Sequence, residues 1–166
     1  IARHGETAAT EWAEGIKANL ARRPQGNDRA QVKAIWAGEC DIAIGNNYYM
    51  AKMLGDEEQK AWAESVTIRF PTFENGGVHM NISGVAMTKS APNKEAALKL
   101  MEWLTSDNAQ AIYAEVNGEY PVKPGVAASE LVQSFGIFKQ DTASMAEIGA
   151  ARPAAVKIME TIDFDG

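Results

Sequence analysis

The sequence predicts an α/β protein, for three reasons. Segments with the apolar spacing of amphipathic helices recur along the whole chain. Short runs that are rich in β-branched residues or alternate in polarity stand between them, at 20–24, 41–44, 66–70 and 79–87. Glycine, proline, asparagine and serine separate the two kinds of segment. Helices that alternate with strands pack in layers, so an α/β architecture is expected.

Composition narrows the possible functions. The chain has 166 residues, enough for one domain with a sizeable core, and 46% of them are hydrophobic. Its net charge is −6 and it has no basic run, which argues against a nucleic-acid partner. No apolar stretch approaches the ~18 residues of a membrane span, so no membrane insertion is expected. Cys40 is the only cysteine and cannot form an internal disulfide.

In the first half of the chain, cap residues mark where helices begin. Thr7 is the expected N-cap of a helix that extends to Leu20. Asp28 and Gln31 have the spacing of a capping box, and Asn27 lies in the loop before them. That box starts a helix over 28–38. Further helices are expected over 48–54 and 57–63, and a turn over 74–77.

The second half is more helical. Pro92 and Asn93 open the most regular helix, which ends at Leu104 and has its apolar residues on one face. Ser106 caps the next helix, which extends to Gly118. A proline-containing extended segment follows. The remaining helices are expected over 129–135, 142–148 and 153–162.

The stretch around residue 48 has the composition of a binding site. A predicted strand ends at Gly45, and Asn46 and its neighbour can cap the helix that follows. That helix begins with two adjacent tyrosines, Tyr48 and Tyr49. In a strand, neighbouring side chains would point to opposite faces, whereas on the first turn of a helix both can lean over its end. The two phenols are therefore expected to converge.

Two converging phenols suit a hard cation. A phenol has a pKa near ~10, so a bound trivalent ion would have to supply most of the driving force for its ionisation. The phenolate oxygen is a hard anionic ligand and is known on ferric iron in haem proteins. The alternative is structural, since most tyrosine pairs are amphipathic packing with wet hydroxyls. The dipeptide alone leaves both interpretations open.

Several longer segments resemble the ferric-iron-binding proteins of bacterial ABC transporters. The resemblance runs over essentially the whole chain, in the family's order. It is carried by four segments: NLARRPQGNDR (19–29), AGECDIAIGNNYY (37–49), SGVAMTKSAPN (83–93) and EYPV (119–122). The helix that follows the third segment ends with the sequence WLTS, as in the family. The strand–helix–Ser segment alone would fit many solute-binding proteins. The sequence NNYY is the part that points to ferric iron.

The resemblance implies a fold and a division of the chain. It implies the C-terminal half of a two-lobed periplasmic-binding-protein fold of type II, with a mixed sheet flanked by helices in each lobe. Residues 1–78 and 129–166 would then form most of the C-terminal lobe. Residues 79–128 would return to the N-terminal lobe. The missing N-terminal half is therefore an expected partner.

The resemblance also implies a function. Iron(III) would be captured in the cleft between the lobes, with Tyr48 and Tyr49 as ligands and further ligands from the N-terminal half. A synergistic anion such as carbonate or phosphate would be held by Asn46 and Asn27. The loaded protein would deliver iron to the membrane permease of an ABC transporter. It would be periplasmic, or attached like a lipoprotein to the outer face of the membrane.

Other classes remain as alternatives. A solute-binding protein for another small anionic or metal-complexed ligand is the runner-up, and a ligand-sensing or enzyme domain on the same fold is the third. An enzyme is not expected, because Ser83 and Gly84 do not form a nucleophile elbow and no triad or nucleotide-binding motif is present. His4 and His79 are not spaced to join Tyr48 as ligands.

Overall fold

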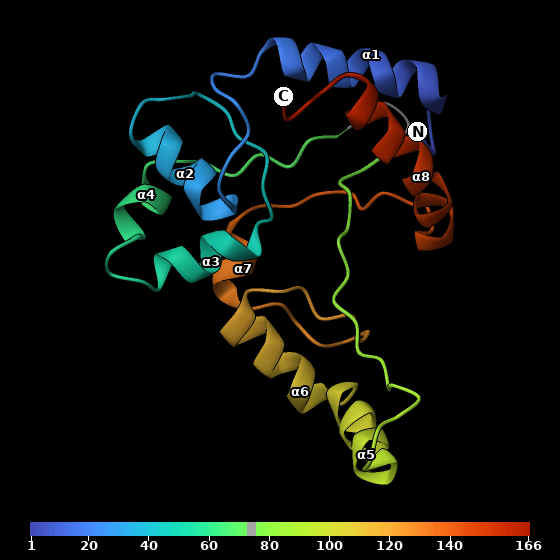
Figure 1. Ribbon diagram of the computed structural model, residues 1–166. Coiled ribbons are helices and arrows are strands. Elements are labelled where there is room, and N and C mark those ends of the chain that lie inside the picture. The colour runs from blue at the N-terminus through green and yellow to red at the C-terminus, as the bar shows by residue number, and fades with distance from the viewer. Residues whose placement is uncertain (73–75) are drawn as a thin grey trace.

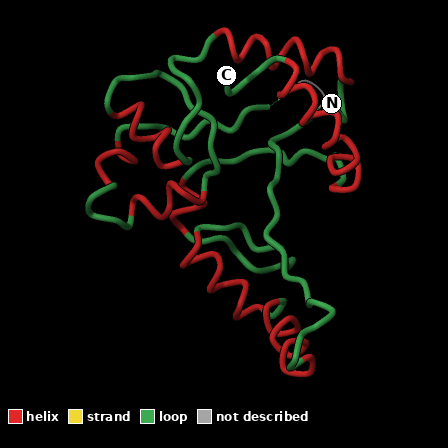
Figure 2. The backbone as a smooth tube through the Cα atoms, in the orientation of Figure 1, coloured by secondary structure: helices red, strands yellow, loops and turns green. Residues whose placement is uncertain are grey.

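The computed structural model describes residues 1–72 and 76–166, and these residues are mostly helices joined by long connections (Figures 1 and 2). The elements in chain order are α1 (Gly5–Ala18), α2 (Asp28–Trp36), α3 (Tyr48–Leu54), α4 (Lys60–Glu64), α5 (Lys94–Leu104), α6 (Asp107–Ile112), the π-helical turn η1 (Tyr113–Asn117), α7 (Glu130–Ser134) and α8 (Met145–Thr161). In these ranges, no helix has the length and apolar character that crossing a bilayer demands.

Helix α3 lies at the centre of the packing. It contacts α2, α4, α7 and η1, while α1 packs against α8. Met53 on α3 is completely buried, and Met50 and Ala63 join it in the core. Side chains of α2 and α4, among them Val32 and Trp62, close the cluster. The buried face of α3 therefore fixes the helix whose first residues are the two tyrosines.

The segment over 79–128 extends away from this centre. Figure 1 shows a long extended connection leading to α5 and α6, which lie apart from α1–α4, and a second connection returning to α7. Helix α5 has no buried residue, although its apolar side chains share one face. This is the segment that the resemblance assigns to another lobe, and the lobe assignment of 1–78, 79–128 and 129–166 stays a prediction.

The predicted mixed sheet is not found among the described residues, and the strands expected at 20–24, 41–44, 66–70 and 79–87 form no ladder there. The side chains of Ile42 and Ile44 are 85% and 72% exposed. A strand needs a neighbour to pair its backbone groups, and an alternating pattern shows only that a segment suits a sheet. Of the turn expected over 74–77, residues 74 and 75 lie outside the described ranges.

One β-bridge does connect distant parts of the described chain. Val78 and Gln140 form a parallel bridge, in which the Val78 amide donates to Lys139 O at 2.8 Å and the Asp141 amide donates to Val78 O at 2.9 Å. Nearby, the guanidinium of Arg3 forms an ion pair with the Asp141 carboxylate. The bridge therefore joins the start of the connection that leads to α5 with the connection between α7 and α8.

Several predicted helix boundaries are wrong. Helix α1 begins at Gly5, with His4 rather than Thr7 at the N-cap position. Helix α2 is capped by Asn27, whose Oδ1 accepts from the Ala30 amide at 3.1 Å, so Asp28 is the first helical residue and not the cap. The one-residue shift at α2 follows from backbone geometry, because the capping residue needs an extended conformation, which Asn27 has.

The C-terminal helices also differ from the prediction. The helices expected over 142–148 and 153–162 are a single helix, α8, which contains Pro153. Proline removes one backbone donor but has a helical φ, and the capping box of Ser144 and Glu147 together with the flanking alanines favours a continuous helix. The helix expected over 106–118 passes into η1 at Tyr113.

Gly118 lies directly after η1, where the chain packs closely against α3. Its φ is +66°, and a Cβ there would overlap the Cβ of Ala51 and lie 3.7 Å from Tyr48 O. We expect Gly118→Ala to lower the free energy of unfolding by about 1–3 kcal/mol, measured by urea denaturation. Gly125→Ala is the matched control, since Gly125 has φ +89° and open space around its Cβ position. Equal losses in both variants would show that the overlap with α3 has no cost.

Candidate metal site

The tyrosines begin α3 directly after a tight turn. The Tyr49 amide donates to Asn46 O at 3.3 Å, and the Met50 amide donates to Asn47 O at 3.0 Å. Asn47 holds the N-cap position with helical dihedral angles, φ −63° and ψ −27°, and its side chain makes no cap bond. The predicted asparagine cap is therefore wrong, because a capping side chain needs an extended backbone. The side-chain Nδ2 of Asn47 is buried without a hydrogen-bond partner among the described residues.

The structure brings the two phenols together. The ring centroids of Tyr48 and Tyr49 are 4.7 Å apart and the ring planes are inclined by 43°. Both residues are half-buried, so their rings pack while the site stays open to solvent. The convergence expected from a helix start is confirmed as geometry.

Burial and nearby negative charge determine the protonation state of the site. Desolvation raises the pKa of the Tyr48 phenol above its ordinary value, and the charges of Tyr49, Asp28 and Glu119 raise that pKa further. Without a cation, Tyr48 is therefore a neutral phenol at neutral pH. The same two carboxylates make the site attractive to a positive ion, whose charge would reverse their effect on the phenol.

A cationic side chain lies over the second ring. The guanidinium carbon of Arg29 is 5.7 Å from the Tyr49 ring centroid. Arg29 Nη1 also donates to Gln59 Oε1 at 3.5 Å, and Gln59 Nε2 donates to Asp56 Oδ2 at 2.8 Å. A cation over an aromatic face is attracted by the ring, so this chain of contacts links α2 and the start of α4 to Tyr49.

The two asparagines expected to hold an anion already have partners. Asn27 Oδ1 caps α2, as described above. The Asn46 backbone amide and its Nδ2 both donate to Asp28 Oδ1, at 2.7 Å and 3.0 Å. Asn46 Oδ1 accepts from Asn81 Nδ2 at 3.5 Å. An external anion at Asn46 would have to replace the Asp28 carboxylate, and the anion-binding roles of Asn46 and Asn27 stay predictions.

Sequence reasoning missed three charged residues near the tyrosines: Asp28, Arg29 and Glu119. Glu119 accepts from Ser83 Oγ at 2.9 Å and from Asn117 Nδ2 at 3.3 Å. It belongs to the EYPV segment, which indicated only family membership. Asp28 was assigned to a helix cap, and no spacing rule relates it to a turn that begins near residue 45. These contacts are tertiary and leave no periodic signal.

Other candidate ligands do not gather at the site. In residues 1–72 and 76–166, no three side chains among His, Cys, Asp and Glu come close enough to hold a metal together. The Tyr120 ring packs edge-on against Phe138 at 5.3 Å, and its buried hydroxyl has no partner. Burial raises the pKa of that phenol. Tyr120 therefore packs against Phe138 rather than beside Tyr48 and Tyr49 as a further ligand.

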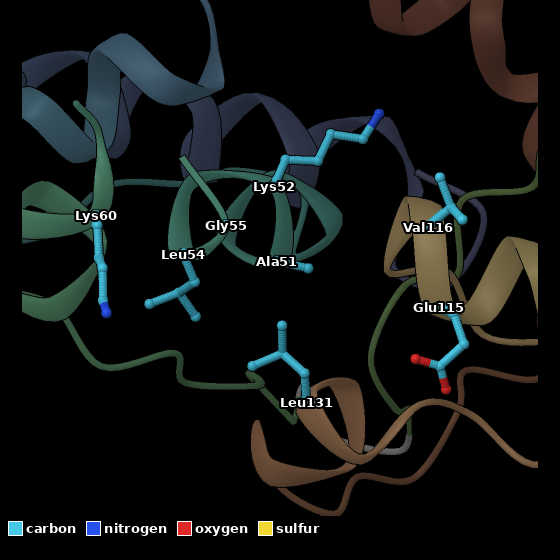
Figure 3. A pocket seen from close by; sticks show the side chains of 8 residues that line it. All are labelled: Ala51, Lys52, Leu54, Gly55, Lys60, Glu115, Val116 and Leu131. Carbon is cyan, nitrogen blue, oxygen red and sulfur yellow. The ribbon is translucent and has the colours of Figure 1, made fainter. Parts of the chain in front are cut away.

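An open groove of about 570 Å³ lies against the same helix but away from the tyrosines. Figure 3 shows Leu54 of α3 and Leu131 of α7 facing each other across it, with Lys52, Lys60 and Glu115 around them. Neither tyrosine lines this groove. The half-buried tyrosine pair therefore lies outside this groove.

Comparison with known proteins defines the class. Residues 2–143 match the family described as bacterial extracellular solute-binding protein, and the chain belongs to that family. The chain is 48% identical over 157 residues to iron uptake protein A1 of Synechocystis sp., covering 93% of this chain and 44% of that protein. It is 30% identical over 125 residues to the major ferric iron-binding protein of Neisseria meningitidis, covering 75% of this chain and 37% of that protein.

Solved structures of ferric-binding proteins show the same backbone. Ferric iron-binding protein A of Mannheimia haemolytica, in an open conformation, is 50% identical with a TM-score of 0.92, over 98% of this chain and 51% of that one. A Trichodesmium protein in complex with iron and citrate ligands is 42% identical with a TM-score of 0.88, over 97% and 52%. The chain spans about half the length of the relatives it matches.

Proposed function

We propose that this chain is part of the ferric-iron-binding component of an ABC-type iron uptake system, with Tyr48 and Tyr49 as iron ligands. The observation that carries the proposal is the pair of phenol rings at 4.7 Å on the first turn of α3. It stands in a chain similar to proteins named for iron uptake and ferric iron binding. Phenolates are hard anionic ligands that suit a hard trivalent cation.

The two tyrosines would provide only part of the coordination shell. Ferric iron takes more than two ligands, and no group of three or more His, Cys, Asp or Glu side chains among the described residues could hold a metal ion. We therefore place the remaining ligands on a second lobe that closes over Tyr48 and Tyr49. A synergistic anion, carbonate or phosphate, would sit on the Asn46 and Asn27 side and compete with Asp28 for the Asn46 donors.

The proposed domain organisation follows from exposed apolar surface. Residues 79–128 would belong to the second lobe, because α5 leaves Leu98 and Leu100 about half exposed and lies apart from α1–α4 (Figure 1). The loaded protein would be periplasmic or held at the outer face of the membrane, and would deliver iron to a permease. We propose no catalytic role, since the similar proteins are named for uptake and binding.

A ferric complex with a small acid is the second candidate ligand. The Trichodesmium relative was solved with iron and citrate. Titration of the full-length protein with ferric citrate and with citrate-free ferric iron separates the two candidates. Free Fe³⁺ is expected to bind at one ion per protein and to produce a visible phenolate-to-iron band. Binding of ferric citrate alone would favour the second candidate, and no binding of either would contradict the proposal.

The affinity for iron should depend strongly on pH. Burial and neighbouring charges hold the pKa of Tyr48 above its ordinary value, so iron must displace its proton. Each displaced proton makes affinity rise by about tenfold per pH unit below that pKa. We expect affinity to increase steadily from pH 6 to pH 8, measured by competition with a chelator whose own protonation is corrected for. Affinity that is independent of pH would show that no phenol ionises on binding.

A further inference from the structure

The first turn of α2 lies against the turn that precedes the tyrosines. Asp28 Oδ1 accepts from the Asn46 backbone amide at 2.7 Å and from Asn46 Nδ2 at 3.0 Å. At Gly45, a Cβ would lie 3.3 Å from the same carboxylate oxygen, so glycine allows a close approach here. One carboxylate thus holds both the backbone and the side chain of the residue two positions before Tyr48.

The carboxylate of Asp28 is not needed to cap its own helix. Asn27 caps α2 through the Ala30 amide. On the other side of the contact, Asn47 makes no side-chain cap bond to α3. The start of α3 is therefore tied down from another helix rather than by its own cap residue. Removing the carboxylate would leave a part-buried backbone donor at Asn46 unpaired.

We propose that Asp28 is a positioning residue that fixes the turn over 45–47, and through it the two phenol oxygens, in the geometry that receives iron. This inference rests on the proposed function. The next residue, Arg29, also helps to hold the tyrosine pair, because its guanidinium carbon lies 5.7 Å from the Tyr49 ring centroid. The start of α2 therefore contacts the tyrosine pair at two points, the turn before it and the face of one ring.

Positioning matters for a metal site because ligands must be held within about 0.5 Å of productive geometry. Partners that orient metal ligands typically change metal affinity by about 10- to 100-fold when they are removed. Tyr49 packs against the core cluster of Met50, Met53 and Ala63, but the turn before the pair has no side-chain cap bond of its own at Asn47. We therefore expect Asp28 to affect affinity although it does not itself contact the iron.

The test uses three variants of the full-length protein. Asp28→Ala removes the acceptor, and Asp28→Asn keeps an acceptor oxygen of the same size without the charge. Glu147→Ala is the matched control, because Glu147 Oε2 accepts from the Ser144 amide at 2.7 Å and from Ser144 Oγ at 2.8 Å on α8. Each variant is measured for ferric affinity, for the wavelength of the visible band and for unfolding in urea.

We expect Asp28→Ala to lower ferric affinity by about 10- to 100-fold and to shift the visible band, while Asp28→Asn keeps most of the affinity. Glu147→Ala should lose stability but not affinity. If Asp28→Asn loses as much affinity as Asp28→Ala, the charge and not the positioning is responsible, and the proposal is wrong. It is equally wrong if Asp28→Ala binds iron as the wild type does.

An iron-free measurement separates this proposal from the proposed function. In the wild type, the Asn46 amide should be protected from hydrogen exchange, and nuclear Overhauser effects should connect the Tyr48 and Tyr49 rings. Asp28→Ala should lose the protection and weaken the ring contacts, whereas Glu147→Ala should change neither. Unchanged protection and ring contacts in Asp28→Ala would overturn the positioning role, whether or not the wild type binds iron.

Discussion

Tyr48→Phe and Tyr49→Phe should each weaken ferric binding in the full-length protein more than any other single substitution proposed above. Phenylalanine keeps the ring packing at 4.7 Å but removes the oxygen that would bind the metal. Loss of a direct ligand should lower the metal affinity by more than the factor of about 10 to 100 that is typical when a residue that only orients a ligand is removed. Affinity is measured by chelator competition, and the visible phenolate-to-iron band should weaken in each variant and vanish in the double variant.

Tyr113→Phe is the control for the loss of a phenol elsewhere in the chain. Tyr113 begins η1 and is half-buried as the site tyrosines are. Its replacement should leave affinity and the band unchanged. If Tyr48→Phe and Tyr49→Phe also leave both unchanged, the pair is a packing feature and iron binds elsewhere.

The second large effect concerns the 166-residue chain on its own. Two phenolates cannot saturate ferric iron. Large apolar side chains are also exposed in the unpaired segments and on α5: Ile42, Ile44, Ile82, Val85, Leu98, Leu100 and Trp103. Exposed apolar surface of this kind favours association. We expect the isolated chain to elute as associated species in gel filtration, and to bind iron far more weakly than the full-length protein.

Calorimetry on the same sample measures both unfolding and iron binding, and can contradict this expectation. A monomer that unfolds in one cooperative transition and binds Fe³⁺ as tightly as the full-length protein would show that the second lobe is unnecessary. Adding the missing N-terminal half as a separate chain should restore a defined complex and raise the iron affinity, which would support the proposal. The full-length protein is the control for both measurements.

The tyrosine site could be anticipated because its information is local. Glycine and asparagine end the preceding segment, and two adjacent phenols then fall on the first turn of a helix, so their convergence follows from helix geometry. The structure confirms that convergence. The cap that was expected at the same place is absent, because Asn47 has helical rather than extended dihedral angles.

The contacts that hold the site could not be anticipated. Asp28 is 18 residues from Asn46 in the sequence, and no periodic pattern relates them. The strand pattern around Ile42 does not predict a sheet by itself. It indicates a segment that suits a sheet, but it does not identify the strand with which that segment would pair. Pro153 shows the converse case, in which a local helix-breaking signal is overridden by a strong cap and good helix formers around it.

The most direct test of the account is an X-ray structure of the iron-loaded full-length protein, with anomalous data collected at the iron absorption edge. We expect one anomalous peak within bonding distance of the phenol oxygens of both Tyr48 and Tyr49, with Asp28 still hydrogen-bonded to Asn46. A peak at any other position, or a peak that neither phenol oxygen reaches, would contradict it.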